Sequence, residues 1–156
     1  RVDFAFVDAR LVQSRQQLMT AIVQAIVGAM RRDPKRPDAE VGLKTPSIHS
    51  DLLWTLHSNN NIAEALRRFG VSRTTRTLIL VRVAPPLDAG ELVQHMTQLV
   101  DGTLQTRGLS LPSPALAWSE LGTAYKIQDT PAFQHPDTSQ VDALICSMVA
   151  SKYVGA

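Results

Sequence analysis

The sequence has a single cysteine, Cys146, among its 156 residues, so no disulfide can form within the chain and a reducing compartment is favoured. It also has no apolar run close to the roughly 20 residues that a membrane helix requires, and no signal peptide opens it. We therefore expect no membrane partner. The chain starts at Arg1 rather than at methionine, directly before an apolar run, and we expect that an N-terminal segment is missing.

Sequence motifs of common enzyme classes are absent as well. There is no glycine-rich phosphate loop, no dinucleotide fingerprint and no paired cysteine or histidine spacing for a metal, so we predict no cofactor. His49, Ser50 and Asp51 are adjacent, and adjacent side chains on a helix cannot point at one another as a catalytic triad must. The pattern predicts a protein that is not an enzyme. A small hydrolase remains an alternative, and it would need a pocket that gathers His49, Asp51 or Glu64 with perturbed pKa values.

The composition is that of a globular chain with an uneven charge distribution. Hydrophobic residues make up 44% and charged residues 19%, which excludes a disordered class. The net charge is +2, but residues 1–82 hold 13 basic and 7 acidic residues, whereas residues 83–156 hold 3 and 7. Such asymmetry indicates an anionic partner for the first half, with nucleic acid as the leading candidate, or charges that only solvate helix faces.

Apolar periodicity in the first part of the chain predicts one strand and two helices. The run Phe4–Val7 is typical of a buried strand, and Ser14 with Gln17 three residues later is typical of a helix-capping box. A further helix is predicted from Ser47, after an exposed loop over residues 31–42. The residues expected on the core face of the first helix are Leu18, Ala21, Ile22, Ala25, Ile26, Ala29 and Met30.

The stretch HSNNNIAEALRRFGVS, residues 57–72, predicts a short helix with unusual polarity around it. Asn61 is expected to cap this helix, with Glu64 closing a capping box, and Gly70 is expected to end it in the left-handed conformation. Two arginines in the last turn suit the helix dipole. The expected apolar side consists of Ile62, Leu66 and Phe69.

The second half predicts a largely buried strand at TLILVRV, residues 77–83, and a helix capped by Asp88 that carries Leu92, Met96 and Leu99. Residues 101–114 are expected to be irregular, residues 115–124 to form a short helix, and YKI a turn. The tail is an amphipathic helix whose apolar face is Val141, Leu144, Ile145, Met148 and Val149. The predicted fold class is α+β (mixed α/β), a single domain over residues 1–156 with a small central sheet flanked by several helices.

Several of these segments resemble the TPRKB family. The resemblance rests on FAFVDARLV, on SRQQLMTAIVQAI, and on KTPSIHSDLLWTLHSNNNIAEALRRFGVS, and it is most specific from Asn61-Ile62 to Phe69-Gly70. LVDGTL, AYKI and the amphipathic tail are similar to later family landmarks. Two differences are an expected strand and helix upstream of FAFVDARLV, which are missing here, and divergent stretches at residues 31–42 and 130–139.

The resemblance implies a non-catalytic subunit of the KEOPS (EKC) complex, which installs threonylcarbamoyl on an adenosine of tRNA. Its expected direct partner is the PRPK-type atypical kinase, which it binds and stimulates, with the other KEOPS subunits reached through that kinase. The 3′ end of tRNA is a further expected contact, and the expected localisation is cytoplasm and nucleus. The main alternative is a stand-alone RNA-binding module that binds tRNA without a kinase.

Two surfaces are predicted from these considerations, each with a simpler explanation. Exposed apolar patches mark partner contacts, so the kinase-binding prediction falls at the end of the tail helix, although its apolar face could be core. Arginines suit phosphates and asparagines suit base edges, although both could serve only as solvating charges and caps. The predicted kinase-binding residues are Met148, Val149, Lys152, Tyr153 and Val154. The predicted tRNA-binding residues are Lys44, Asn60, Asn61, Ile62, Arg67, Arg68 and Arg73.

Overall fold

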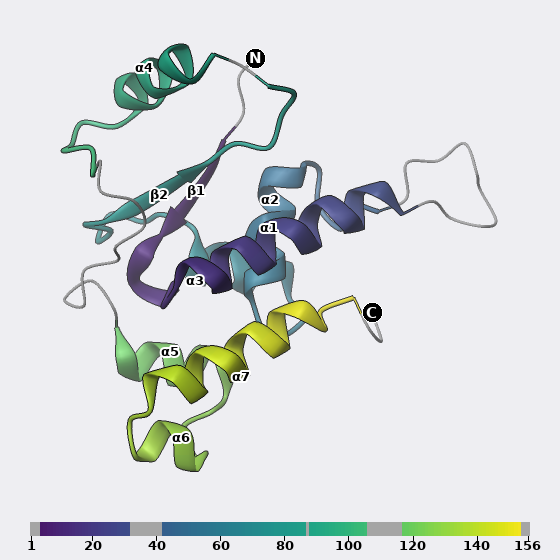
Figure 1. Cartoon of the computed structure of the whole chain (residues 1–156), viewed down its shortest axis with the longest axis vertical. Helices are drawn as coiled ribbons and strands as arrows, with labels where there is room; N and C mark the ends of the chain where they lie inside the picture. The colour runs from purple at the N-terminus through teal and green to yellow at the C-terminus, as the bar shows by residue number, and fades with distance from the viewer. Residues whose placement is uncertain (1–3, 32–41, 87, 106–116, 154–156) are drawn as a thin grey trace.

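The computed structural model describes residues 4–31, 42–86, 88–105 and 117–153. The predicted loop at 31–42 and the irregular stretch at 101–114 lie largely outside these residues. Figure 1 shows the elements in chain order: β1 (Ala5–Asp8), the 3-10 helix η1 (Ala9–Leu11), α1 (Arg15–Met30), α2 (Ile48–Leu56), α3 (Ile62–Phe69), β2 (Leu78–Val81), α4 (Ala89–Leu99), α5 (Trp118–Tyr125), α6 (Pro131–Gln134) and α7 (Thr138–Ala150).

The predicted α+β class is confirmed, with a sheet of two strands among the described residues. β1 and β2 pair antiparallel, Ala5 opposite Val81 and Asp8 opposite Leu78. On its other edge β1 makes a single bridge, from Val7 to Gly70. The prediction of a largely buried second strand is wrong, because all four β2 residues are only half-buried.

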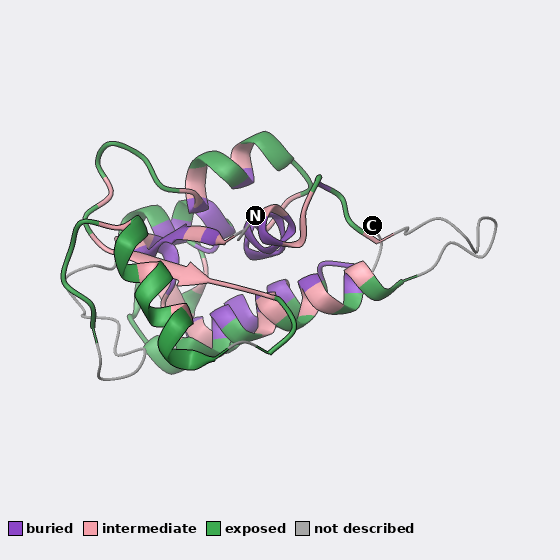
Figure 2. Cartoon of the chain, turned by 90° about the horizontal axis from the view of Figure 1, so that it is seen from above, coloured by how far each residue is buried: buried purple, intermediate pink, exposed green. Residues whose placement is uncertain are grey.

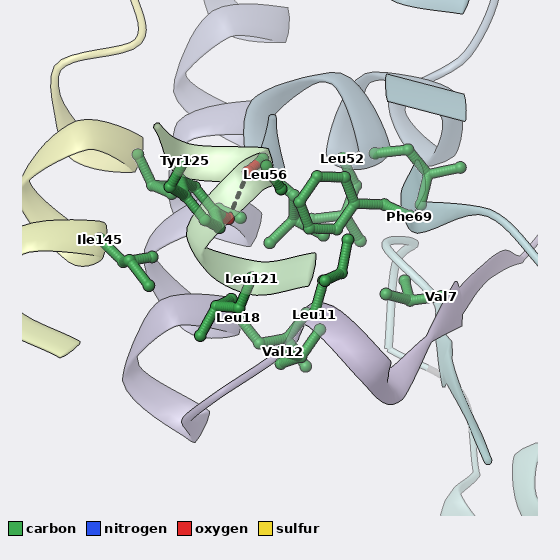
Figure 3. Close-up of a cluster of buried hydrophobic side chains, with 14 of the residues drawn as sticks. Val7, Leu11, Val12, Leu18, Leu52, Leu56, Phe69, Leu121, Tyr125 and Ile145 are labelled. Atoms are coloured by element: carbon green, nitrogen blue, oxygen red, sulfur yellow. Dashed lines mark hydrogen bonds between the residues drawn. The ribbon is translucent and has the colours of Figure 1, made fainter. Parts of the chain in front are cut away.

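The core lies between the helices and β1. α1 packs against α2 and α7, and α2 packs against α3 and β1. Figure 3 shows how side chains from α1, α2, α3, α5 and α7 converge, with Tyr125 between Ile145 of α7 and Leu56 of α2. The Tyr125 hydroxyl donates to the Leu56 carbonyl oxygen at 2.5 Å and accepts from the Gln17 side-chain amide at 2.9 Å. A phenol that is fully buried thus has both a donor and an acceptor partner, and the bond to Leu56 fixes the end of α2.

Helix starts follow the predicted caps. Ser14 accepts from the Gln17 backbone N–H at 3.0 Å, and Asp88 accepts from Gly90 and Glu91. α2 begins after Ser47, whose hydroxyl accepts from the Ser50 backbone N–H. In each case the cap satisfies a backbone donor that the first helical turn leaves unpaired.

The prediction that Met30 faces the core is wrong, and helix α4 is exposed along its length. Met30 is 75% exposed, although Gly28 in the same turn is buried. Leu99 is 52% exposed. The structure describes every residue of α4, and none of them is buried. Figure 1 shows α4 at the upper edge of the molecule, away from α5, α6 and α7. In Figure 2 buried residues gather in the middle of the molecule and exposed residues surround them.

Candidate functional site

The asparagine loop, which we define as residues 57–61, connects α2 to α3, and its own side chains supply part of its hydrogen bonds. The Asn59 side-chain oxygen accepts from the Asn61 backbone N–H at 2.8 Å, and its amide nitrogen donates to Glu64 at 3.1 Å. The Asn61 side chain accepts from the Glu64 backbone N–H at 3.0 Å, which confirms Asn61 as the cap of α3. Asn59 is therefore used inside the loop, whereas Asn60 and Asn61 are exposed.

Glu64 does not close the predicted capping box, because Asn59 already occupies the Asn61 N–H. The Glu64 carboxylate instead accepts from Asn59 and from the Arg68 guanidinium, the latter at 2.9 Å. The hydrogen bonds from Asn59 and Arg68 lower the pKa of Glu64 to about 2. Burial lowers the pKa of His57, whose Nε2 lies 3.8 Å from Glu64, so this imidazole is neutral at pH 7. Arg68 is thus committed to an intrahelical ion pair.

Lys152 approaches this loop from the other end of the chain. Its side chain is buried, and its ammonium donates to the carbonyl oxygens of His57, at 2.7 Å, and Asn59. The Nζ atom also lies 4.3 Å from the centre of the Trp54 ring, within range of a cation–π contact. Burial lowers the pKa of Lys152 to about 8, so most molecules keep the charge at pH 7. The buried ammonium is therefore stabilised by two carbonyl oxygens and by the face of an aromatic ring.

The outer surface of α3 combines cations with apolar side chains. Arg67 on α3 is exposed, and Arg73 and Arg76, in the segment between α3 and β2, are exposed as well. Of the predicted apolar side, Phe69 is buried, whereas Ile62 and Leu66, one helical turn apart, are 37% and 40% exposed. The helix packs through Ala65 and Phe69, both fully buried. The exposed side of α3, with Ile62, Leu66 and Arg67, suits a partner that offers both phosphates and apolar faces.

Lys44 is not brought to the asparagine loop. Its backbone N–H donates to the Asp51 carboxylate in the first half of α2, whereas the loop follows the last turn of the same helix. Lys44 is exposed at that position. The predicted tRNA-binding residues therefore spread along the α2–α3 pair, with Asn60, Asn61 and Ile62 at one end of α3 and Arg67 and Arg68 at the other.

Gly70 ends α3 for a different reason from the predicted one. Its φ is −75°, so it does not adopt the left-handed conformation. A Cβ at this position would lie 2.3 Å from the Leu66 carbonyl oxygen, so the close approach of backbone requires glycine. Gly70 and Val71 border an open groove of about 500 Å³, which Phe4, Phe6 of β1 and the first turn of α2 also line.

The residues that a hydrolase would need are engaged separately. His49 Nε2 accepts from the Val83 backbone N–H at 3.0 Å, and the Asp51 carboxylate accepts from Thr45 at 2.7 Å. Glu64 lies on another helix within its own network. Among the described residues, no cluster of three or more histidine, cysteine or carboxylate side chains could hold a metal ion. None of the helices in that part of the chain is both long and apolar enough to cross a membrane.

The end of α7 differs from the exposed apolar patch that the sequence predicts. Val149, Lys152 and Tyr153 are buried, Met148 is half-buried, and Val154 lies outside the described residues. The Tyr153 ring packs on Trp54 with centroids 5.4 Å apart. These side chains serve the domain itself, and their contact with a kinase stays a prediction. Sequence reasoning missed the bond from Lys152 to the loop, because no local pattern signals a contact across more than 90 residues.

Residues 1–153 match the model of a protein family described as kinase binding protein CGI-121. The EKC/KEOPS complex subunit CGI121 of Gibberella zeae is 36% identical over 107 residues, which cover 64% of this chain and 50% of that protein. The subunit of the same name from Cryptococcus neoformans var. neoformans serotype D is 30% identical over 179 aligned residues, covering 98% and 77%. The match thus spans half of the first relative and about three quarters of the second.

Proposed function

Since this chain belongs to the CGI-121 family of kinase-binding proteins, we propose that it is a non-catalytic subunit of a KEOPS (EKC) complex. In this role it binds a PRPK-type atypical kinase directly, stimulates its ATP hydrolysis and reaches the other subunits through it. It also helps to recruit tRNA for threonylcarbamoyl-adenosine modification, in the cytoplasm and nucleus. The observation that carries the proposal is the family match over residues 1–153, supported by the relatives named as complex subunits.

The tRNA part of the proposal rests on the outer surface of α3. Exposed arginines neutralise phosphates and release counterions, which gives binding that weakens as salt rises. Ile62 and Leu66 offer apolar contact to bases that are not stacked in a duplex, and Asn60 and Asn61 offer amide groups to base edges. Arg67 is free of the ion pair that holds Arg68, so Arg67 and Arg73 are the better phosphate ligands.

The kinase part is tested by co-purification of this chain with a PRPK-type kinase, followed by measurement of the kinase's ATP hydrolysis with and without it. A stable complex with faster hydrolysis is expected. Failure of a chain extended upstream to bind the kinase would overturn the proposal.

The tRNA part is tested by affinity measurements on the complex with Arg67 and Arg73 replaced by alanine. Loss of two phosphate contacts is expected to weaken binding and to reduce the slope of log affinity against log salt by about 2. Arg15→Ala, which removes an exposed charge at the start of α1, is the matched control. Tight tRNA binding by the isolated chain, independent of the kinase, would favour the stand-alone RNA-binding alternative.

A further inference from the structure

The asparagine loop is closed by a residue that follows α7. Lys152 is 95 residues from His57 and 93 from Asn59, and its ammonium donates to the carbonyl oxygens of both. The two carbonyls belong to the peptide group before Ser58 and the peptide group after Asn59, so one side chain fixes the direction of both. Ser58 adds a third tie, since its hydroxyl donates to the Ala124 carbonyl at 2.7 Å.

The position of Lys152 is itself fixed by its neighbours. Its Nζ lies over the Trp54 ring, and the Tyr153 ring packs against the same tryptophan. Tyr153 also rests on α1 at Gly28, where a Cβ would lie 2.1 Å from the phenol oxygen. The Trp54 indole N–H points at the Asn60 carbonyl at 3.4 Å. Lys152 and Tyr153 are therefore seated between α1, α2 and the loop, and the ammonium has little freedom to move away.

Lys152 acts on the exposed asparagines through Asn59. The Asn59 carbonyl accepts from Lys152, its backbone N–H donates to His57 Nδ1 at 3.0 Å, and its side chain holds the Asn61 N–H and Glu64. Charge-assisted bonds to Lys152 are stronger than neutral ones, and they are made where water is largely excluded. A change at Lys152 should therefore alter the direction in which Asn60 and Asn61 face.

We propose that Lys152 is a positioning residue for the tRNA surface: it locks the asparagine loop in the shape that presents Asn60, Asn61 and Ile62. The inference rests on the proposed recruitment of tRNA and assigns Lys152 a place in it without direct contact. It also makes the end of α7 and the start of α3 one structural unit, although they lie far apart in the sequence.

The test is Lys152→Met in the complete complex, purified to equal kinase content, with tRNA affinity measured over a range of salt. Methionine keeps most of the bulk of the side chain and removes the ammonium group that donates both hydrogen bonds. If the binding-competent loop falls to about one tenth of molecules, the apparent Kd rises about tenfold. The salt slope is expected to stay unchanged, because Lys152 neutralises no phosphate, whereas Arg67→Ala is expected to reduce it by about 1.

Two further variants complete the series. Lys152→Arg keeps a charged donor and is expected to recover much of the affinity, and Arg15→Met removes an exposed charge at the start of α1 and is expected to change little. Should the methionine variant fail to fold, Lys152→Gln retains an N–H donor and is expected to show a smaller loss of affinity. Wild-type affinity in the folded Met or Gln variant would overturn the inference.

Hydrogen exchange of the Asn59 and Asn61 amides separates this inference from the proposed function. Faster exchange at both amides in the Lys152 variant is expected, because both N–H groups are bonded within the loop that Lys152 closes. Unchanged exchange would overturn the role of Lys152 whether or not tRNA binds. If the wild-type complex binds tRNA no better than the complex without this chain, tRNA recruitment fails instead.

Discussion

The asparagine loop is polar and helix α4 carries several apolar side chains, but other elements bond to the loop and leave α4 exposed. The loop receives bonds from Lys152 and Trp54 and donates one to α5 through Ser58. α4 carries apolar Val93 and Leu99 at 45% and 52% exposure, with no buried residue along its length. The difference teaches that exposure here does not follow from sequence polarity. The loop receives contacts from outside its own segment, whereas α4 has no buried residue.

The largest effect that would sharpen this comparison is expected from Phe69→Ala. Phe69, the last residue of α3, is fully buried, and its ring packs edge-on against the rings of His57 and Tyr125. Loss of its ring leaves a cavity, and we expect a loss of about 3–5 kcal/mol in the free energy of unfolding. Val93→Ala on α4 is the control, with a change within about 0.5 kcal/mol. Chemical denaturation measures both, and equal losses would show that α4 belongs to the core.

A smaller effect is expected from Tyr125→Phe. The change removes only the hydroxyl, so the buried Leu56 carbonyl loses this donor, whereas the Gln17 amide loses one acceptor and keeps its bond to the Leu11 carbonyl. Buried groups left unpaired in this way cost about 1–3 kcal/mol. Thermal or denaturant unfolding measures the loss. Thr123→Val in α5, whose exposed hydroxyl bonds within its own helix, is the control, and an equal loss there would argue against a special role for the buried phenol.

The smallest effect concerns the pH dependence of the α3 network. The pKa of Glu64 is lowered from 4.5 to about 2, because Asn59 and Arg68 bond to the charged form. The native state therefore binds this proton less readily than the unfolded chain. Its stabilising contribution is complete above about pH 4.5 and is lost as the pH falls toward 2. We expect Glu64→Gln to reduce the acid dependence of stability in that range, measured by denaturation at several pH values; identical pH profiles would contradict it.

What the sequence could predict depends on how far away the partner residue lies. The caps at Ser14, Asn61 and Asp88 have partners within three residues, so local patterns find them. The bonds of Tyr125 to Leu56 and of Lys152 to His57 span 69 and 95 residues, and they depend on how helices pack. Such contacts have no signature in a single sequence.

The helix α3 shows a second limit of the sequence. Ile62, Leu66 and Phe69 have the spacing of one apolar face, but the neighbours of α3 cover only Phe69 and Ala65. Periodicity tells which residues share a stripe and not which stripe another element covers. For the same reason the predicted tail residues Val149 and Tyr153 are interior, while the candidate surface on α3 is richer in apolar side chains than the sequence indicated.

The one cysteine has a practical consequence. Cys146 lies on the inner side of α7, and burial raises the pKa of its thiol to about 11. Since the thiolate is the reactive form, the folded chain should resist alkylation at neutral pH. With no other thiol in the sequence, the rate of modification reports a single event, the opening of the last helix. The rate of alkylation of Cys146 thus measures, without any added label, how stable the helix is that places Lys152.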